Sequence, residues 1–183
     1  TKPQVELLVK EAALGCDMPY VNQKWIPGLL TNFSTIKERI RSLQTLQTEE
    51  ATGGFSKYTK KEITQLKKKI QKLEAAFGGV KTLSRLPDVL FVLDSVREVI
   101  AVKEANRLTI PIVALMNTHG DPTCVSYPIP GNDNAMKSLT YILTTIKDAI
   151  LSGKKKRKIP AAPSHPKPST PAAHHSSKAV AAA

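Results

Sequence analysis

The sequence predicts an α/β protein with a parallel sheet, an antiparallel helical hairpin and a basic tail. Two apolar runs, residues 89–93 and 110–116, flank a helical pattern, which is typical of buried parallel strands joined by a helix. Residues 32–77 show two narrow apolar seams separated by glycines, which is the pattern of two helices that pack on each other. Residues 154–183 are rich in proline and alanine and contain no acidic residue.

Composition sets limits on the class of protein. The chain has 183 residues, of which 41% are hydrophobic and 5% aromatic, enough for one domain with a modest core. No run approaches the ~18 apolar residues of a membrane-spanning helix, and residues 1–8 lack the layout of a secretory signal. Cys16 and Cys124 make no disulfide scaffold and match no zinc-ligand spacing. We therefore expect no membrane partner, and a reducing compartment.

The formal net charge of +12 lies in two segments. Residues 37–76 hold ten Lys+Arg and five acidic residues, and residues 154–183 hold seven Lys+Arg and no acid. The rest of the chain holds ten of each and is neutral. A neutral body with two basic segments predicts a polyanionic partner, with nucleic acid ahead of a membrane surface. The alternative for the hairpin is an ordinary solvated helix face.

The N-terminal part predicts a helix, a short strand and a turn. Residues 3–14 have helical spacing, and residues 20–22 suit an edge strand. Pro27-Gly28 marks a turn, after which Thr31 or Asn32 can cap the next helix.

The hairpin pattern extends over two helices. Its seams have coiled-coil spacing and consist of Phe33, Ile36, Ile40, Leu43 and Leu46, then Ile63, Leu66, Ile70, Leu73 and Phe77. Thr59 and Glu62 form a capping box for the second helix, which Gly78-Gly79 should end. The two helices can satisfy each other, so the arm is expected to project from the body.

The body predicts a right-handed α/β unit. Its order is strand, helix, strand, loop and helix, over residues 88–94, 96–107, 110–116, 117–122 and about 134–151. Asn132 or Asp133 should cap the last helix. Two long strands do not complete a doubly wound sheet, so we expect a separate chain or an N-terminal segment to supply further strands.

The predicted division is a body of residues 1–153 and a tail of residues 154–183. Residues 159–183 cannot bury enough apolar surface to offset their ordering entropy, so we expect them to be disordered when free. Phosphate contact is favoured over a nuclear-localisation signal for the preceding cluster of Lys154, Lys155, Lys156, Arg157 and Lys158.

No catalytic residue, cofactor or metal site is predicted. No phosphate-cradling glycine motif follows either strand. His119 and Asp121 share a loop after a strand, where α/β enzymes often keep their sites, but ordinary loop hydrogen bonding is the favoured interpretation. Cys124 lies nearby without an oxyanion motif.

Several motifs, in order, resemble the ribosomal protein S2 family of bacteria and organelles. Residues 20–33 are similar to the family pattern YVN-x-RW-LGG-x-LTNF, and further matches follow as far as residue 153. The matching positions are Trp25, Gly28, Thr31, Asn32, Pro87, Asp88, Asp94, Glu98, Glu104, Pro111, Asp121, Pro122, Pro130, Asn132 and Asp133. Lys24 replaces an Arg and Pro27 replaces a Gly of that pattern, and the loop 117–121 and Asn134 also depart from it.

The resemblance implies a Rossmann/flavodoxin-like sheet, incomplete in this chain, with the hairpin inserted. It implies a structural ribosomal protein that binds small-subunit rRNA near the neck, contacts neighbouring ribosomal proteins and catalyses nothing. It also implies an N-terminal part before Thr1, and with the unusual tail this favours an organellar over a bacterial ribosome. Trp25 is expected to pack in the core in preference to stacking on a base. The predicted RNA contacts are Lys24, Lys37, Arg39, Arg41, Lys60, Lys61, Lys67, Lys68, Lys69, Lys72, Lys154, Lys155, Lys156, Arg157 and Lys158. An extra-ribosomal RNA-binding or assembly factor, and an α/β enzyme using the His119–Asp121 loop, remain alternatives.

Overall fold

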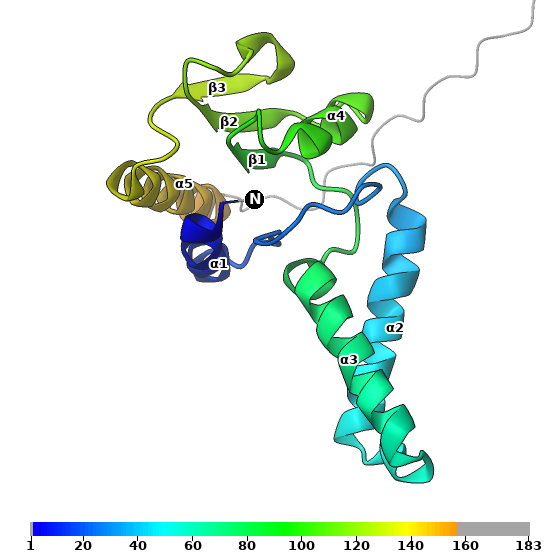
Figure 1. Cartoon of the computed structure of the whole chain (residues 1–183). Coiled ribbons are helices and arrows are strands. Elements are labelled where there is room, and N and C mark those ends of the chain that lie inside the picture. The colour runs from blue at the N-terminus through cyan, green and yellow to red at the C-terminus, as the bar shows by residue number, and fades with distance from the viewer. Residues whose placement is uncertain (1, 157–183) are drawn as a thin grey trace, which may run out of the picture.

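Three parallel strands lie between two layers of helix in the computed structural model, which describes residues 2–156 (Figure 1). Strands β1 (Leu90–Leu93), β2 (Ile112–Met116) and β3 (Tyr127–Pro130) are paired in the order β1-β2-β3. Leu90 lies opposite Ile112, and Val113 lies opposite Tyr127. The predicted α/β fold with a parallel sheet is confirmed.

Helices α1 (Glu6–Gly15) and α5 (Met136–Lys156) cover one face of the sheet (Figure 1). The predicted N-terminal helix is confirmed, with a 3₁₀ turn at Pro3–Val5 preceding α1. The apolar cluster on this face joins Val5, Leu115, Leu139 and Leu143. Phe91 and Leu93 of β1 pack against it while remaining half-buried.

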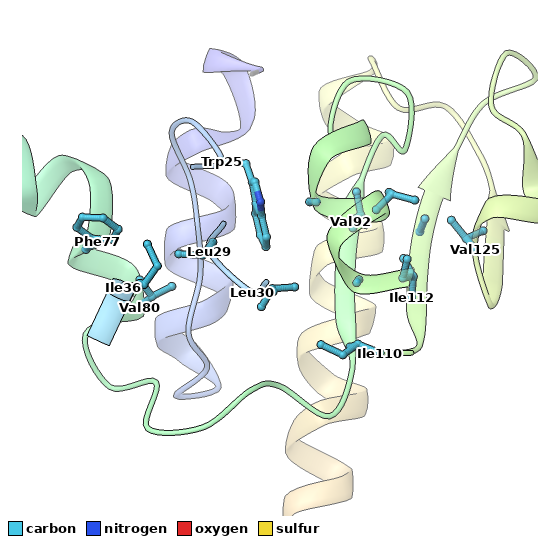
Figure 2. Close-up of a cluster of buried hydrophobic side chains, with 14 of the residues drawn as sticks. Trp25, Leu29, Leu30, Ile36, Phe77, Val80, Val92, Ile110, Ile112 and Val125 are labelled. Atoms are coloured by element: carbon cyan, nitrogen blue, oxygen red, sulfur yellow. The ribbon is translucent and has the colours of Figure 1, made fainter. Parts of the chain in front are cut away.

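Helix α4 (Val99–Arg107) and the loop of residues 25–30 cover the other face. Figure 2 shows the resulting cluster, in which Trp25 lies between the sheet and the base of the hairpin. Leu29 and Leu30 are 2% and 3% exposed, so this loop is part of the core. One continuous core therefore joins the hairpin to the body.

The third strand was not predicted. Residues 127–130 contain two prolines and are mostly exposed, so they lack the apolar run that predicts a buried strand. Pro is tolerated on an edge strand because the outer N–H positions need no partner. The flanking residues fasten β3 to β2, with Ser126 N donating to Ile112 O at 3.0 Å and Gly131 N to Met116 O at 3.0 Å.

The predicted edge strand at residues 20–22 is wrong. The segment forms no strand, and it is positioned by a backbone hydrogen bond from Tyr20 N to Gly79 O at 2.9 Å. A Cβ at Gly79 would collide with the backbone oxygen of Tyr20. The segment therefore lies against the end of the hairpin, where its backbone has no sheet edge to join.

The hairpin consists of α2 (Phe33–Ala51) and α3 (Lys60–Phe77), and it projects away from the sheet (Figure 1). Leu43, Phe55 and Ile70 form a small core of its own. The capping box is confirmed, with Glu62 N donating to Thr59 Oγ1 and Thr59 N donating to Glu62 Oε2. Helix α3 ends at Phe77, before the two glycines, as predicted.

Two predicted caps differ in their details. Asn32 occupies the N-cap position of α2, but its side chain accepts from Thr35 Oγ1 and caps no backbone N–H. Before α5, Asn132 Oδ1 accepts from Asn134 N and Ala135 N, at 2.9 Å each. Of the two candidates at that position, Asn132 is therefore the cap.

Helix α5 is longer than predicted. It continues past Leu151 to Lys156, so the first three residues of the expected tail, residues 154–156, form its last turn. Its interior has no proline, and lysines in a last turn are favoured by the helix dipole. Arg157, Lys158 and the rest of the predicted disordered tail lie outside the described residues.

Candidate nucleic-acid interface

Glu104 fixes the loop that precedes the hairpin. Its carboxylate accepts hydrogen bonds from Gly28 N at 2.7 Å, Leu30 N at 2.9 Å and Thr31 N at 3.1 Å. It also accepts from Trp25 Nε1 and from the Thr31 hydroxyl, both at 3.2 Å. A positive φ of 88° at Gly28 lets the chain turn around this carboxylate. A single buried side chain thus organises the whole segment.

The loop makes Glu104 a stable anion. Burial raises the pKa of the Glu104 carboxyl, but hydrogen bonds from Thr31, Leu30, Gly28 and Trp25 outweigh it and hold the pKa below its usual value. Trp25 is 9% exposed and its ring lies in the core, so the expected core packing is what the structure shows (Figure 2). The Trp25 ring therefore packs in the hydrophobic core.

Most of the predicted RNA-contact residues of the hairpin are exposed. Within residues 2–156, five lysines of α3 have exposed side chains that form no ion pair; they are Lys60, Lys61, Lys68, Lys69 and Lys72. Arg39 and Arg41 on α2 are exposed as well. The hairpin therefore presents most of its positive charge to solvent.

Two predicted contacts of the hairpin are partly engaged within the protein. The Lys37 amine donates to Ser84 O at 2.8 Å and lies 5.6 Å from the centre of the Phe33 ring. Lys67 lies 3.7 Å from Glu50 Oε1, in an exposed pair that contributes little.

Two predicted contacts from distant parts of the sequence are brought together at the base of the hairpin. Lys24 and Lys72 line the same groove of about 270 Å³, between the loop and α3. The remaining walls are Gln23 and Ile26 from the loop, and Ala75 and Ala76 from α3.

The lysines at the end of α5 form a separate basic site. Lys154 donates to Cys16 O at 2.7 Å and lies 3.6 Å from Asp17 Oδ2, which fixes this end of α5 to the end of α1. Lys155 and Lys156 are exposed.

A buried polar network lies at the carboxyl ends of the strands. Lys2 Nζ lies 2.9 Å from Asp94 Oδ2 and 3.2 Å from Asp133 Oδ2, and Asn117 Nδ2 donates to Asp133 Oδ1 at 3.0 Å. Burial raises the pKa of Asp94, but bonds from Lys2 and from the backbone of Arg97 and Val96 hold it below its usual value. Asp94 itself has a φ of 85°. The network joins the N-terminal segment to the loops after β1 and β3.

The loop of His119 and Asp121 shows ordinary turn geometry. His119 is exposed, and its backbone N donates to Asn117 Oδ1 at 2.8 Å. Asp121 accepts from the backbone and hydroxyl of Thr123, which lower its pKa, and Cys124 Sγ lies 3.4 Å from its Oδ2. Among residues 2–156 no three His, Cys, Asp or Glu side chains are grouped so as to hold a metal ion. No described helix is long and apolar enough to cross a membrane.

The other family-motif residues shape turns and strand ends. Asp88 pairs with Arg85 through two bonds of 3.1 and 2.8 Å. Pro122 begins the 3₁₀ turn after Asp121, Pro130 ends β3, and Pro111 O accepts from Leu90 N as the strands begin to pair. Pro87 is half-buried just before β1.

Sequence reasoning assigned no role to Glu104 or Lys2. The sequence shows no charge partner for Glu104, because its partners in the structure are backbone N–H groups more than seventy residues away. Two signals were available for Glu104: its match to the family pattern, and its place beside the apolar inward positions of α4. Lys2 gave no such signal.

These features define a class of protein: an α/β body from which a lysine-rich helical hairpin projects. The family model "Ribosomal protein S2" matches residues 1–153. The chain belongs to the ribosomal protein S2 family.

Similar proteins carry the name "Small ribosomal subunit protein uS2". That of a Nitratiruptor species is 48% identical over 157 residues, covering 86% of this chain and 59% of the relative. That of Campylobacter hominis is 47% identical over 154 residues, covering 84% and 58%. That of Dictyoglomus thermophilum is 47% identical over 154 residues, covering 84% and 63%. The chain thus spans about three-fifths of the length of these relatives, which are bacterial and give no support to the organellar preference.

Proposed function

We propose that this chain is a structural constituent of the small ribosomal subunit and binds rRNA phosphates through the exposed lysines of α3. One observation carries the proposal: five lysines of α3 are exposed on a hairpin whose base packs into the core, and they have no ion-pair partner among the described residues. A solvated helix face can carry lysines for solubility alone, but a row of unpaired cations on one arm also creates a positive potential that attracts a polyanion. When lysines neutralise RNA phosphates, the counterions condensed on the RNA are released, and this release favours binding.

The relatives support the same proposal through their printed name, which assigns them to the small ribosomal subunit. RNA helices are recognised mainly through their shape and backbone, and lysine ammonium groups suit such contacts. The role is therefore structural, and translation is supported by holding rRNA in place. No observation on the His119 loop favours catalysis over this role.

The sheet also suggests a protein partner. β1 lies at one edge of the sheet in the described part of the chain, and only Val92 of its four residues is fully buried. An apolar strand with an open edge is a template for pairing with another strand. We propose that a further segment or chain pairs with β1 in the assembled particle, and that neighbouring small-subunit proteins surround it.

The first proposal is tested by charge reversal on the hairpin. Changing Lys68, Lys69 and Lys72 to Glu should reduce incorporation into small subunits several-fold, measured by sedimentation of the tagged variant from cells. Lys67 is left unchanged because it already lies near Glu50. The matched control changes Lys10, Arg107 and Lys137, which are exposed on the body, by the same total charge. Normal incorporation of the hairpin variant, or equal loss for both, would contradict the proposal.

A further inference from the structure

We propose that the groove between residues 23–26 and α3 holds a single phosphate of the bound rRNA, shared by Lys24 and Lys72. The inference rests on the proposed function and deepens it, because it names one contact point on the protein. The two lysines are 48 positions apart in the sequence (72 − 24) and line the same groove.

The groove combines two cations with an apolar lining. Lys24 and Lys72 are exposed, and neither has an ion-pair partner among residues 2–156. Ile26 and Ala76, which also line the groove, are half-buried and apolar. A nucleotide backbone has the matching pattern, with a ribose that can lie on carbon atoms and a phosphate that needs cations.

Both walls of the groove are held in place by the core. Lys24 is next to Trp25, whose indole donates to Glu104 at 3.2 Å. Lys72 lies just over one helical turn before Phe77, which is 2% exposed. The hydrogen bond from Tyr20 N to Gly79 O connects the loop directly to the end of α3. The groove is therefore formed before any partner binds, which lowers the entropic cost of binding.

The surroundings favour an RNA chain over an isolated small anion. Lys61, Lys68 and Lys72 have the spacing i, i+7, i+11, which places them along one face of α3 leading to the groove. A row of cations suits a polymer of phosphates, whereas a single small anion would contact only the lysine at the end of the row.

A salt-dependent double-mutant cycle tests the sharing of one phosphate. The probe is transcribed small-subunit rRNA of the same organism, titrated with wild-type protein and with the variants Lys24→Ala, Lys72→Ala and the double variant. Each single change should weaken binding about three- to fivefold. The effect of the double variant should differ from the product of the two single effects, because both lysines serve one phosphate. Its slope of log K against log salt should fall in magnitude by only about 0.9.

The comparator pair is Lys61→Ala with Lys72→Ala, two lysines about three helical turns apart. Its effects should multiply, and its salt slope should fall by roughly twice as much. Thermal unfolding of each variant checks that the fold is kept.

Three results would overturn the inference. The first is unchanged rRNA binding by Lys24→Ala. The second is that the effects of Lys24→Ala and Lys72→Ala multiply, with twice the expected loss of salt slope in the double variant. The third is intact rRNA affinity with lost subunit incorporation, which would assign the groove to a protein neighbour. Failure of the wild-type protein to bind rRNA in a salt-dependent way would instead remove the proposed function itself. The two failures are therefore distinguishable.

Discussion

At the scale of single residues, Glu104 is the residue on which the geometry of the interface depends most. It is 7% exposed and receives five hydrogen bonds from the loop that carries Lys24. A buried carboxylate without these donors would be strongly unfavourable, so the loop and the charge stabilise each other.

Glu104→Gln should lower the free energy of unfolding by about 2–4 kcal/mol. The amide group of Gln would face backbone N–H donors with a donor of its own, and the charge that strengthens the remaining bonds would be lost. Urea unfolding at neutral pH measures the change. Glu11→Gln on the exposed face of α1 is the control and should stay within about 0.5 kcal/mol. Equal stability of the two variants would show that the loop is held by its apolar residues alone.

The same residue gives the stability a defined pH dependence. The pKa of Glu104 is lower in the folded protein than in the unfolded chain, where it is about 4.3. Its contribution is therefore fully present above about pH 4.3 and is lost as the pH falls through the folded pKa. The difference in unfolding free energy between wild type and Glu104→Gln should shrink as the pH falls through this range. A difference that stays constant down to about pH 3 would contradict the assignment.

Gly79 should tolerate no side chain. A Cβ there would meet the backbone oxygen and the ring of Tyr20, and backbone cannot move aside cheaply. Gly79→Ala should therefore cost about 1–3 kcal/mol in unfolding free energy. Gly153→Ala is a control of opposite sign, because nothing lies within 4 Å of its Cβ and Ala is preferred in a helix by about 0.5–1 kcal/mol. A stabilising effect at Gly79 would contradict the close approach of the loop to α3.

The Gly78-Gly79 pair could be predicted to end a helix, and it does. The close packing of Gly79 on Tyr20 could not, because a contact between segments so far apart leaves no periodic pattern. Thr31 or Asn32 was expected to cap α2, but the Thr31 hydroxyl donates to Glu104 and the Asn32 side chain accepts from Thr35, bonds that composition does not reveal.

At the scale of elements, the hairpin is the part most fully encoded in its own sequence. Its seams, its glycine-containing turn and its capping box are all local patterns, and each led to a correct element. Strand β3 is the opposite case, since it exists through pairing with β2 and has a sequence that disfavours strands elsewhere. Whether the two helices pack with coiled-coil geometry stays a prediction.

Thr59→Ala should destabilise the protein by about 1 kcal/mol, because it removes the capping box at the start of α3. Thr64→Ala is the matched control: the Thr64 hydroxyl only bonds back to Lys60 O in the helix interior, and Ala has the higher helix propensity. Thermal unfolding should therefore show a lower Tm for the first and an equal or higher Tm for the second. The reverse order would mean that the hairpin does not depend on its N-cap.

At the scale of the whole molecule, a neutral body holds a basic arm in a fixed direction. The cluster in Figure 2 joins the base of the hairpin to the sheet, so the arm and the body behave as one unit at that point. The uneven charge could be predicted by counting residues along the chain. The placement of Lys24 and Lys72 at the same groove could not be predicted, because it depends on how the loop folds over α3.

The proposed role requires that the protein reside in small ribosomal subunits through contacts with rRNA. The most direct test is sedimentation of a native extract through a sucrose gradient, with and without nuclease, followed by detection of the chain. A ribosomal constituent should co-migrate with intact small subunits and monosomes, and should lose that position after nuclease treatment. A chain that stays at the top of the gradient at low salt would contradict the ribosomal role.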